Sequence, residues 1–360
     1  MKKAKKILSI LLSVVICASM LVGCNSSKPS SNSSSASSSQ ATDGKITVTD
    51  MAGRTVEVPA EINSIGTFGA VGVINTFVEL MGCGDKICNE MPANFTKNDK
   101  WKMQYEFAPQ IKDAPLFEDP NGEIIMETVL ETKPDLCITM MKDKVEILEK
   151  KGLTVIYLEW NETEDVKTAV KLMGDVLNKK DVAEEYIKYF DETIKKAEDL
   201  AANIKDDDKK TVLYGSVSQL TQPHVIAEWW IKEAGGISVT DDGRTEDSKY
   251  TYTLEDLLKW NPDVMIVSDK SEIEEIKKDS RLAEITAVKD SAIYPIPTVG
   301  HNWGNRTVEQ PLTILWAMNK IYPDVVTEKD LADEIKNFYQ KFFNYSLSDE
   351  QVDEIINYGE

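Results

Sequence analysis

Hydrophobic and polar positions follow the same pattern in two stretches of the chain that lie 128 residues apart. Residues 126–138 (METVLETKPDLCI) and 254–266 (LEDLLKWNPDVMI) both place apolar side chains three and four residues apart, then a proline, then an apolar run. This spacing is typical of a short helix with one buried face, which the proline ends before a strand begins. A supersecondary unit that occurs twice predicts two similar lobes.

Strand-length apolar runs alternate with helical periodicity through most of the chain. A hairpin is expected from the alternating runs 45–48 and 55–58. Buried strands are expected at 64–68, 86–88, 153–158, 211–215 and 292–296. Helices are expected at 71–81, 143–151, 225–234, 311–321, 328–343 and 348–357. This alternation predicts an α/β fold with doubly wound, parallel sheets.

The longest proline-free helical pattern runs from residue 163 to 204 and is interrupted only near 178–180. Its second part is long enough to join two lobes. We therefore expect two doubly wound lobes joined by a single long helix. The expected domains are an N-terminal α/β lobe (45–160), spanning helices (161–208), a C-terminal α/β lobe (209–325) and a helical tail (326–360). A long loop is expected at 89–122, and loops of that length are uncommon unless they have a function.

The N-terminal segment has the pattern of a processing signal. Four lysines precede an apolar run from Ile7 to Leu21, which is short for a membrane span. The run ends in Leu-Val-Gly-Cys, so residues 1–23 are expected to be a lipoprotein signal peptide and Cys24 the lipidated residue. Residues 24–44, rich in serine, are expected to be a flexible tether. An ordinary secreted protein whose Cys24 merely follows a cleavage site is the alternative.

Acidic residues outnumber basic ones, 61 to 41, and the formal net charge is −20. Removal of the signal peptide would take away four lysines and no acids. Nucleic acid is therefore not expected as a partner, because phosphate contacts need clustered lysine and arginine. A strongly acidic protein at a membrane favours basic partner surfaces, although acidity can also serve only for solubility.

Three of the five cysteines would remain available after processing and lipidation. Cys137 falls in an apolar strand and is expected to be buried. Cys83 and Cys88 could form a disulfide outside the cytoplasm, but a fold of this size does not need one, so the sequence leaves the bridge open.

The chain resembles the periplasmic binding proteins of ABC importers that carry ferric siderophores, haem and cobalamin. The resemblance rests on residues 46–59 (ITVTDMAGRTVEVP), both Glu…Pro-Asp units, the spanning helix and residues 233–236 (EAGG). It covers roughly residues 45–325. It implies a ligand cleft between the lobes and no enzymatic activity. It also implies a monomer outside the cytoplasmic membrane, whose Glu127 and Glu255 meet arginines of a permease dimer. The alternative is that both glutamates only stabilise helix N-termini.

Ligands of open α/β sheets sit beyond the carboxyl ends of the strands, which nominates the loops there. The densest group of candidates is His301, Trp303 and Arg306, in a glycine-flanked loop just after a strand. Further ligand-binding candidates are Arg244, Tyr250, Met91, Trp101, Met141 and His224. For the aromatic residues and methionines the alternative is packing, and for His224 it is helix capping.

Histidine is scarce, with two in the whole chain. A bare transition-metal site built only from protein ligands is therefore not expected. A metal that arrives in a chelator, such as an iron–siderophore complex, fits better, with His301 as the one candidate metal ligand and no resident cofactor. Haem or cobalamin are alternative ligands. A two-lobed cofactor-dependent enzyme is an alternative of a different class, but the chain has no phosphate-binding glycine loop and no HExxH motif. An adhesin or sensor with this fold is a third possibility.

Overall fold

The computed structural model describes residues 44–97, 99–244 and 249–358. The expected signal peptide, Cys24 and most of the expected tether lie outside the described residues. The chain forms β1 (Lys45–Thr49), β2 (Thr55–Pro59) and β3 (Ile65–Phe68), then α1 (Val71–Leu80), α2 (Ala93–Thr96), α3 (Gln104–Phe107) and α4 (Met126–Thr132), then β4 (Leu136–Thr139), α5 (Lys142–Glu149), β5 (Val155–Tyr157), α6 (Glu164–Val176) and α7 (Lys180–Ala201).

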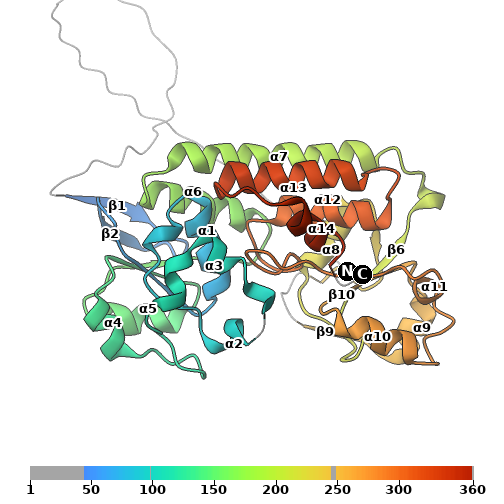
Figure 1. The fold of residues 1–360 in the computed structure, drawn as a ribbon, viewed down its shortest axis with the longest axis horizontal. Helices are drawn as coiled ribbons and strands as arrows, with labels where there is room; N and C mark the ends of the chain where they lie inside the picture. Colours follow the sequence, from blue (N-terminus) through green and yellow to red (C-terminus); the bar gives the residue numbers. More distant parts are fainter. Residues whose placement is uncertain (1–43, 98, 245–248, 359–360) are drawn as a thin grey trace, which may run out of the picture. The chain divides into compact units, whose positions relative to one another are not determined.

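The second half repeats this alternation (Figure 1). It contains β6 (Thr211–Gly215), β7 (Thr221–Gln222), α8 (Ile226–Glu233), β8 (Ile237–Ser238), β9 (Tyr250–Thr251), α9 (Leu254–Trp260), β10 (Val264–Val267), α10 (Ser271–Lys278), α11 (Thr286–Lys289), β11 (Ile293–Pro295), α12 (Gln310–Ile321), α13 (Glu328–Phe342) and α14 (Asp349–Ile356).

Two parallel sheets form the cores of the two lobes, as the repeat predicts. The first lobe contains the sheet β3-β4-β5, and the second contains the sheet β11-β10-β6-β8. An isolated parallel bridge from Ile65 to Ile87 marks the place of the expected strand at 86–88. In both lobes the chain order across the sheet is therefore second, first, third, fourth, an order whose switch point lies between the first and third strands.

Every residue of β4 and of β10 is buried, as expected for central strands of a parallel sheet that is covered on both faces. Cys137 in β4 is fully buried, which confirms that expectation. Cys83, Cys88 and Cys137 are all free, so the described residues contain no bridge between Cys83 and Cys88.

The spanning segment breaks where the sequence indicates. Asn178, between α6 and α7, has a left-handed backbone (φ 54°). The 22-residue helix α7 then runs along one side of the molecule, and α13 of the tail lies beside it (Figure 1). Tyr186 and Tyr189 of α7 pack against Phe342 of α13, with ring centroids 5.6 and 5.4 Å away, and Tyr189 also meets Phe338. The tail is therefore part of the core that joins the lobes.

The region 89–122 is more ordered than the long loop that the sequence predicts. It contains α2, α3 and two short 3-10 helices, because Phe95, Met103 and Ile111 are buried at intervals along it. Gln104 anchors it: its side-chain Nε2 donates to the Gly72 carbonyl at 3.2 Å and to the Gly300 carbonyl at 2.6 Å. The second of these bonds ties the first lobe to a loop of the second.

Candidate functional site

A cavity of about 420 Å³ is lined by residues from both lobes. Its first-lobe walls follow the carboxyl ends of β3, β4 and β5, and its second-lobe walls come from the loop before α8 and the loop between β11 and α12. The lining residues are Ala70, Val73, Met140, Met141, Tyr157, Glu159, Trp160, Asn161, His224, His301, Asn305 and Arg306. It lies where the switch point of the first sheet predicts a ligand.

His301 sits in the loop 297–306, which is fixed in place by Glu309 at the N-terminus of α12. The buried carboxylate of Glu309 accepts hydrogen bonds from the backbone N–H groups of Gly300 (2.9 Å) and His301 (2.8 Å). It also accepts from the hydroxyls of Thr307 (2.8 Å) and Tyr339. The loop is therefore preorganised by one side chain that does not itself line the cavity.

Both histidines are held in the neutral form by their surroundings. Burial lowers the pKa of His301 to about 3, and the nearby His224 and Lys100 act in the same direction. Burial and the charge of Arg306 lower the pKa of His224 to about 4. Burial also lowers the pKa of Arg306. Two neutral imidazoles and a guanidinium thus face one cavity at physiological pH.

Three polar atoms of the lining residues have no hydrogen-bond partner among the described residues. They are His301 Nδ1, Asn305 Oδ1 and Trp160 Nε1. The indole N–H is a donor, the amide oxygen is an acceptor and the imidazole nitrogen can be either. Buried polar groups are normally satisfied, so their gathering at one cavity indicates a polar ligand.

The first-lobe wall combines thioethers with a charged pair. Met141 is exposed to 42% and packs over Gly69, where an added Cβ would lie 2.6 Å from the Met141 sulfur. Gly69 also has a positive φ of 78°. Both the contact with Met141 and this backbone conformation therefore disfavour a side chain at position 69. Glu159 accepts from Lys142 at 2.9 Å, and this hydrogen bond keeps the pKa of Glu159 below its usual value.

Four residues nominated from the sequence meet at this cavity: His301, His224, Arg306 and Met141. Trp101 does not line the cavity, but its ring packs against His301, with the two ring centroids 5.0 Å apart. Met91 and Trp303 are fully buried, so in this conformation neither has surface to offer a ligand. Their placement favours the packing alternative. Gly304, the residue after Trp303, packs directly on Tyr214.

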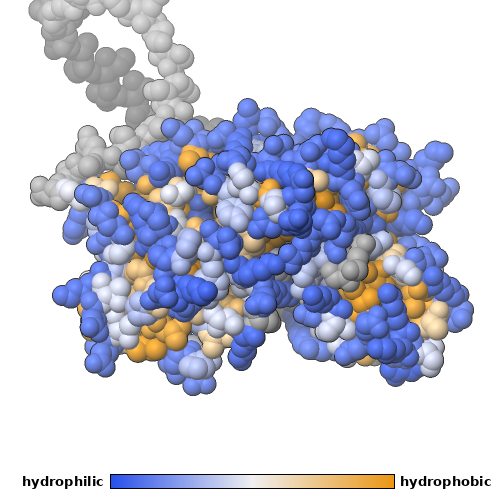
Figure 2. Space-filling view, viewed as in Figure 1, coloured by the Kyte–Doolittle hydropathy of each residue, from blue (hydrophilic) through white to orange (hydrophobic). Residues whose placement is uncertain are grey.

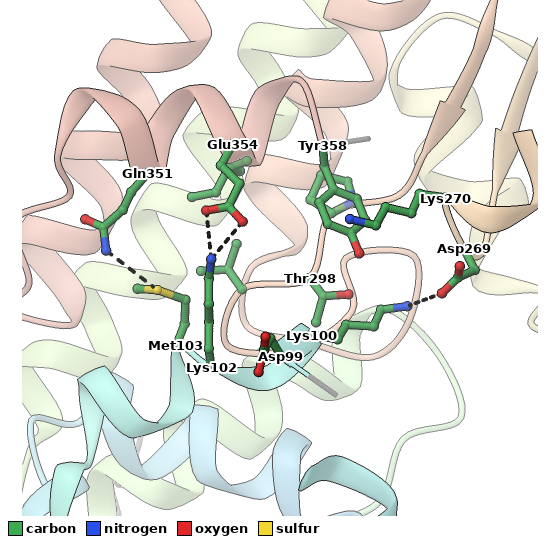
Figure 3. Close-up of a pocket in the computed structure, with 13 residues that line it drawn as sticks. Asp99, Lys100, Lys102, Met103, Asp269, Lys270, Thr298, Gln351, Glu354 and Tyr358 are labelled. Atoms are coloured by element: carbon green, nitrogen blue, oxygen red, sulfur yellow. Dashed lines mark hydrogen bonds and ion pairs between the residues drawn. The ribbon is translucent and has the colours of Figure 1, made fainter. Parts of the chain in front are cut away.

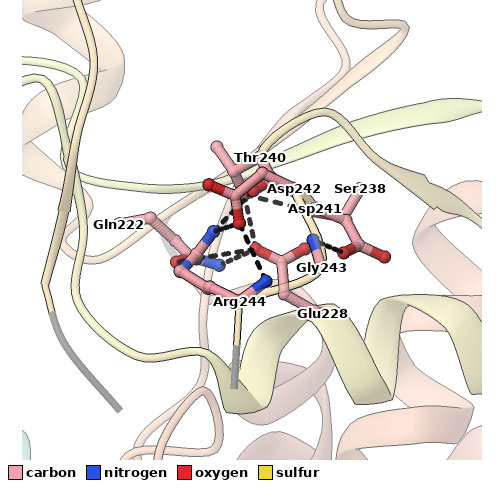
Figure 4. Close-up of polar contacts among 8 residues, drawn as sticks. All are labelled: Gln222, Glu228, Ser238, Thr240, Asp241, Asp242, Gly243 and Arg244. Carbon is pink, nitrogen blue, oxygen red and sulfur yellow. Dashed lines mark hydrogen bonds and ion pairs between the residues drawn. The ribbon is translucent and has the colours of Figure 1, made fainter. Parts of the chain in front are cut away.

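Arg244 and Tyr250, which the sequence also nominated, do not line this cavity. The Arg244 guanidinium pairs with Glu228 at 3.0 Å and donates to the Thr240 carbonyl at 2.6 Å and to the Gln222 side chain (Figure 4). It also lies over the Tyr250 ring, 4.5 Å from the centroid. Arg244 therefore closes a buried polar cluster in the second lobe.

Sequence reasoning missed Trp160, Asn161 and Glu159. They follow β5 directly, so the rule that nominated the other loops at the carboxyl ends of strands also covers them. Asn305 was passed over in favour of its neighbours in the loop 298–306. A buried tryptophan whose indole N–H has no partner is a signal that only coordinates give.

The other face of the 297–306 loop borders a second cavity, of about 460 Å³ (Figure 3). Here the first lobe meets the tail: Lys102 Nζ donates to both carboxylate oxygens of Glu354, at 2.7 and 2.8 Å. Lys100 Nζ lies 3.2 Å from the Ser268 carbonyl and 4.0 Å from Asp269 of the second lobe. Polar contacts thus cross between the lobes on this side of the loop.

Glu127 and Glu255 occupy the first turns of α4 and α9, and both are exposed. Among the residues that the structure describes, neither forms an ion pair. Figure 1 shows α4 and α9 at the edge opposite α7, one in each lobe. This is the placement that a contact with a two-part partner requires.

The described residues contain no group of three histidine, cysteine, aspartate or glutamate side chains arranged to hold a metal ion. A membrane-crossing helix is likewise not found in the part of the chain that the structure covers. The chemistry of the cavity suits binding, because hydrogen-bond donors, acceptors and a cation converge on it.

Comparison with known proteins agrees with this geometry. The molybdate-binding protein MolA of Haemophilus influenzae is 22% identical over 370 residues, covering 91% of this chain and 97% of its own. An uncharacterized ABC transporter substrate-binding lipoprotein of Bacillus subtilis, YvrC, is 21% identical over 336 residues, covering 90% of this chain and all of its own.

A crystal structure of a periplasmic solute-binding protein from Veillonella parvula is similar in fold. Its TM-score is 0.74 at 26% identity, over 86% of this chain and 96% of that one. The sequence model of the periplasmic binding protein family matches residues 92–299, more than half of the chain. The chain therefore belongs to the periplasmic binding protein family, and it is a non-enzymatic, extracytoplasmic substrate-binding component of an ABC importer.

Proposed function

We propose that this protein is a lipid-anchored receptor whose cargo is a metal ion already held by a chelator, with an iron complex as the first candidate. The observation that carries the proposal is the pair of neutral imidazoles, His224 and His301, at one cavity with Arg306. Neutral imidazole is a good ligand for transition metals. Two imidazoles alone do not complete a coordination shell, so a chelator must supply the remaining ligands.

The rest of the lining suits such a complex. The Arg306 guanidinium can pair with a carboxylate or another anionic group of the chelator. Trp160 Nε1 and Asn305 Oδ1 offer one donor and one acceptor to its polar edge. A volume of about 420 Å³ lies at the lower end of the range for small-molecule sites, roughly 300–1,000 Å³, and favours a compact chelate over a corrinoid.

Two further relatives support a metal complex. The iron(3+)-hydroxamate-binding protein YxeB of Bacillus subtilis is 26% identical over 145 residues, 40% of this chain. The haem uptake protein IsdE of Staphylococcus aureus is 24% identical over 246 residues, 64% of this chain. Haem is therefore the first alternative cargo, and cobalamin is a second that rests on the sequence resemblance alone. Met91, one of the ligand-binding candidates from the sequence, does not line the cavity.

An oxyanion such as molybdate is a second candidate from a different ligand class. Its support is the likeness to the molybdate-binding protein along nearly the whole chain, together with the donors Arg306 and Trp160 in the cavity. An oxyanion would accept hydrogen bonds from the guanidinium and N–H groups, and no metal would bind the imidazole nitrogens. The two candidates thus depend on different residues.

The test is a titration of the purified protein, followed by tryptophan fluorescence, with a ferric hydroxamate, the same chelator without iron, haemin, cobalamin and molybdate. We expect the iron-loaded chelator to bind at least tenfold more tightly than its iron-free form. The double variant His224→Ala and His301→Ala should abolish that difference. A second comparison uses the variant Arg306→Gln, with Arg281→Gln at an exposed arginine as its matched control. Tight binding of molybdate that persists in the double histidine variant would establish the oxyanion instead.

Membrane anchoring is the second part of the proposal. Leu21-Val22-Gly23-Cys24 has the form of a lipid-attachment site, and one relative is named a lipoprotein. We expect the mature protein to begin at an acylated Cys24 and to fractionate with membranes as a monomer. Mass spectrometry of the N-terminal peptide checks this, and Cys24→Ala should move the protein to the medium. An unmodified N-terminus at any other residue would refute the anchor.

Docking to the permease is assigned to Glu127 and Glu255, which carry one exposed carboxylate per lobe. Interfacial charges of this kind mainly set orientation and encounter rate. The charge-reversed pair Glu127→Lys and Glu255→Lys should abolish uptake and leave ligand affinity unchanged. Normal uptake by this variant would remove the docking role while leaving the ligand proposal untouched.

A further inference from the structure

The two copies of the repeat are alike in detail that the sequence does not reveal. From 126 to 139 and from 254 to 267, all fourteen equivalent positions have the same class of solvent exposure. Both helices end in a left-handed residue, Lys133 (φ 53°) and Asn261 (φ 45°). Equivalent residues of this unit are therefore exposed to solvent in the same way in both lobes.

One exposed position in each copy carries a large apolar side chain. Leu130 in α4 is exposed to 37% and Leu258 in α9 to 42%, and they are equivalent residues of the repeat. Each lies three residues after a proposed docking glutamate, Glu127 or Glu255, so each shares a helix face with it. Single exposed leucines are ordinary on protein surfaces, but two at matched positions beside matched acids are not explained by chance exposure.

Few other large hydrophobic side chains are exposed in the described part of the chain. They are Leu116, Met141, Ile147 and Ile237. Met141 lines the ligand cavity. The remaining three have no counterpart at the same offset in the other lobe. Figure 2 shows that the face in view is mainly hydrophilic and that hydrophobic residues gather at its lower left and at its lower right.

We propose that Glu127 with Leu130, and Glu255 with Leu258, form two matched docking surfaces, each of which fits a permease site made of a basic side chain beside an apolar depression. This inference rests on the proposed docking to a permease dimer and adds the apolar half of the contact. A partner with two equivalent subunits presents such a site twice, and the acidic chain favours basic groups there. The carboxylates set orientation and encounter rate, whereas the leucines, once buried, slow dissociation.

The charges around the two surfaces are not matched. Glu131 follows Glu127 by four residues, whereas its counterpart Lys259 follows Glu255 by four. All four side chains are exposed. The first surface therefore carries two negative charges, whereas at the second the two negative charges of Glu255 and Asp256 are partly offset by Lys259. The apolar contribution is shared by both lobes, while the salt-dependent attraction is stronger at the first.

The experiment measures docking of ligand-free protein to the permease–ATPase complex of its own host, reconstituted in lipid nanodiscs, at 50 and 500 mM salt. The test variant is Leu130→Gln with Leu258→Gln. The matched control is Ile147→Gln with Ile237→Gln, which removes two equally exposed apolar side chains elsewhere. Melting temperatures and binding of a ferric hydroxamate by each variant verify that the fold and the cleft are intact.

We expect the leucine variant to lose at least tenfold in affinity at both salt concentrations, through faster dissociation. The control should stay within twofold of the natural protein. The charge-reversed glutamate variant should instead lose association rate and most of its salt dependence. Equal docking by the leucine and control variants would overturn this inference alone. Normal docking by the glutamate variant would overturn the proposed docking role on which it rests.

Discussion

The carboxylate of Glu309 accepts a hydrogen bond from the backbone N–H of His301 at 2.8 Å. Three further donors, from Gly300, Thr307 and Tyr339, meet the same carboxylate. The ligand-facing loop is thus built around a buried acid, and the position of the imidazole depends on a residue that does not line the cavity.

Glu309→Gln is expected to destabilise the protein and to loosen the site. An amide keeps one acceptor oxygen and turns an NH₂ group toward donors, so at least one charge-assisted hydrogen bond is lost. We expect a decrease of about 2–3 kcal/mol in the free energy of unfolding and a weaker ligand affinity. Chemical denaturation and ligand titration measure the two effects. Glu192→Gln on the exposed side of α7 is the control and should change stability by less than about 0.5 kcal/mol. Unchanged stability of Glu309→Gln would contradict this role.

Glu79→Gln is expected to stabilise the protein increasingly as pH rises. Both carboxyl oxygens of Glu79 are buried without a partner among the described residues. Burial, and then the charge of Glu309, raise the pKa of Glu79 well above its usual value. Between the unfolded and folded pKa values the native state holds a proton that the unfolded state has released, so stability falls as pH rises through that range.

Glutamine removes this ionisation. The variant should therefore gain in melting temperature relative to the natural protein between pH 5 and pH 8, and the gain should shrink toward pH 3, where both states are largely protonated. Thermal unfolding at several pH values measures it. A difference in melting temperature that does not change with pH would show that the pKa of Glu79 is not raised in the folded protein.

His301 gives a pH dependence of the opposite sign. The pKa of His301 is about 3 in the folded state and about 6.5 in the unfolded state. Below pH 6.5 the unfolded state therefore binds a proton at this residue and the native state does not. Stability is therefore lost as pH falls. Between pH 7 and pH 5 this group should cost about 2 kcal/mol. Urea unfolding of the natural protein and His301→Gln at both pH values isolates the contribution, and parallel pH profiles would contradict the burial of this side chain.

Much of the fold follows from the sequence because its signals are local. The proline after each repeat helix, the left-handed Asn178 between α6 and α7, and the fully apolar strands β4 and β10 are set by residues within one element. The order of region 89–122 and the packing of the tail on α7 depend on contacts far apart in sequence. Gln104 with Gly300 and Tyr189 with Phe342 are examples that no local pattern encodes.

The candidate site was predictable to the level of loops and only partly to the level of side chains. The rule for the carboxyl ends of strands nominates the loops that carry His224, His301 and Met141, and these do meet. It cannot say which side chains turn back into their own lobe. Arg244 does so because Glu228, sixteen residues earlier in the chain, offers it a buried carboxylate.

Arg244→Met tests this structural assignment directly. The guanidinium and Glu228 are both largely buried, so removal of one partner leaves an uncompensated carboxylate and should cost about 3–5 kcal/mol of stability. Ligand affinity of the folded protein should not change. Arg281→Met, at an exposed ion pair with Asp279, is the control and should cost less than about 1 kcal/mol. A large loss of ligand affinity with little loss of stability would contradict this structural role and would indicate that Arg244 contacts the ligand.

Lys259→Glu tests the unequal charge of the two docking surfaces. The change replaces the cation four residues after Glu255 by an acid, the residue type that Glu131 provides four residues after Glu127. Because attraction between exposed charges acts on encounter, we expect association with the permease to become about three- to tenfold faster at 50 mM salt and to be unchanged at 500 mM. Lys278→Glu makes the same change of charge at an exposed site on α10 and should leave association within twofold. Stopped-flow measurements with the reconstituted permease give both rates, and equal acceleration by the two variants would mean that net charge acts on docking and the position of the charge does not.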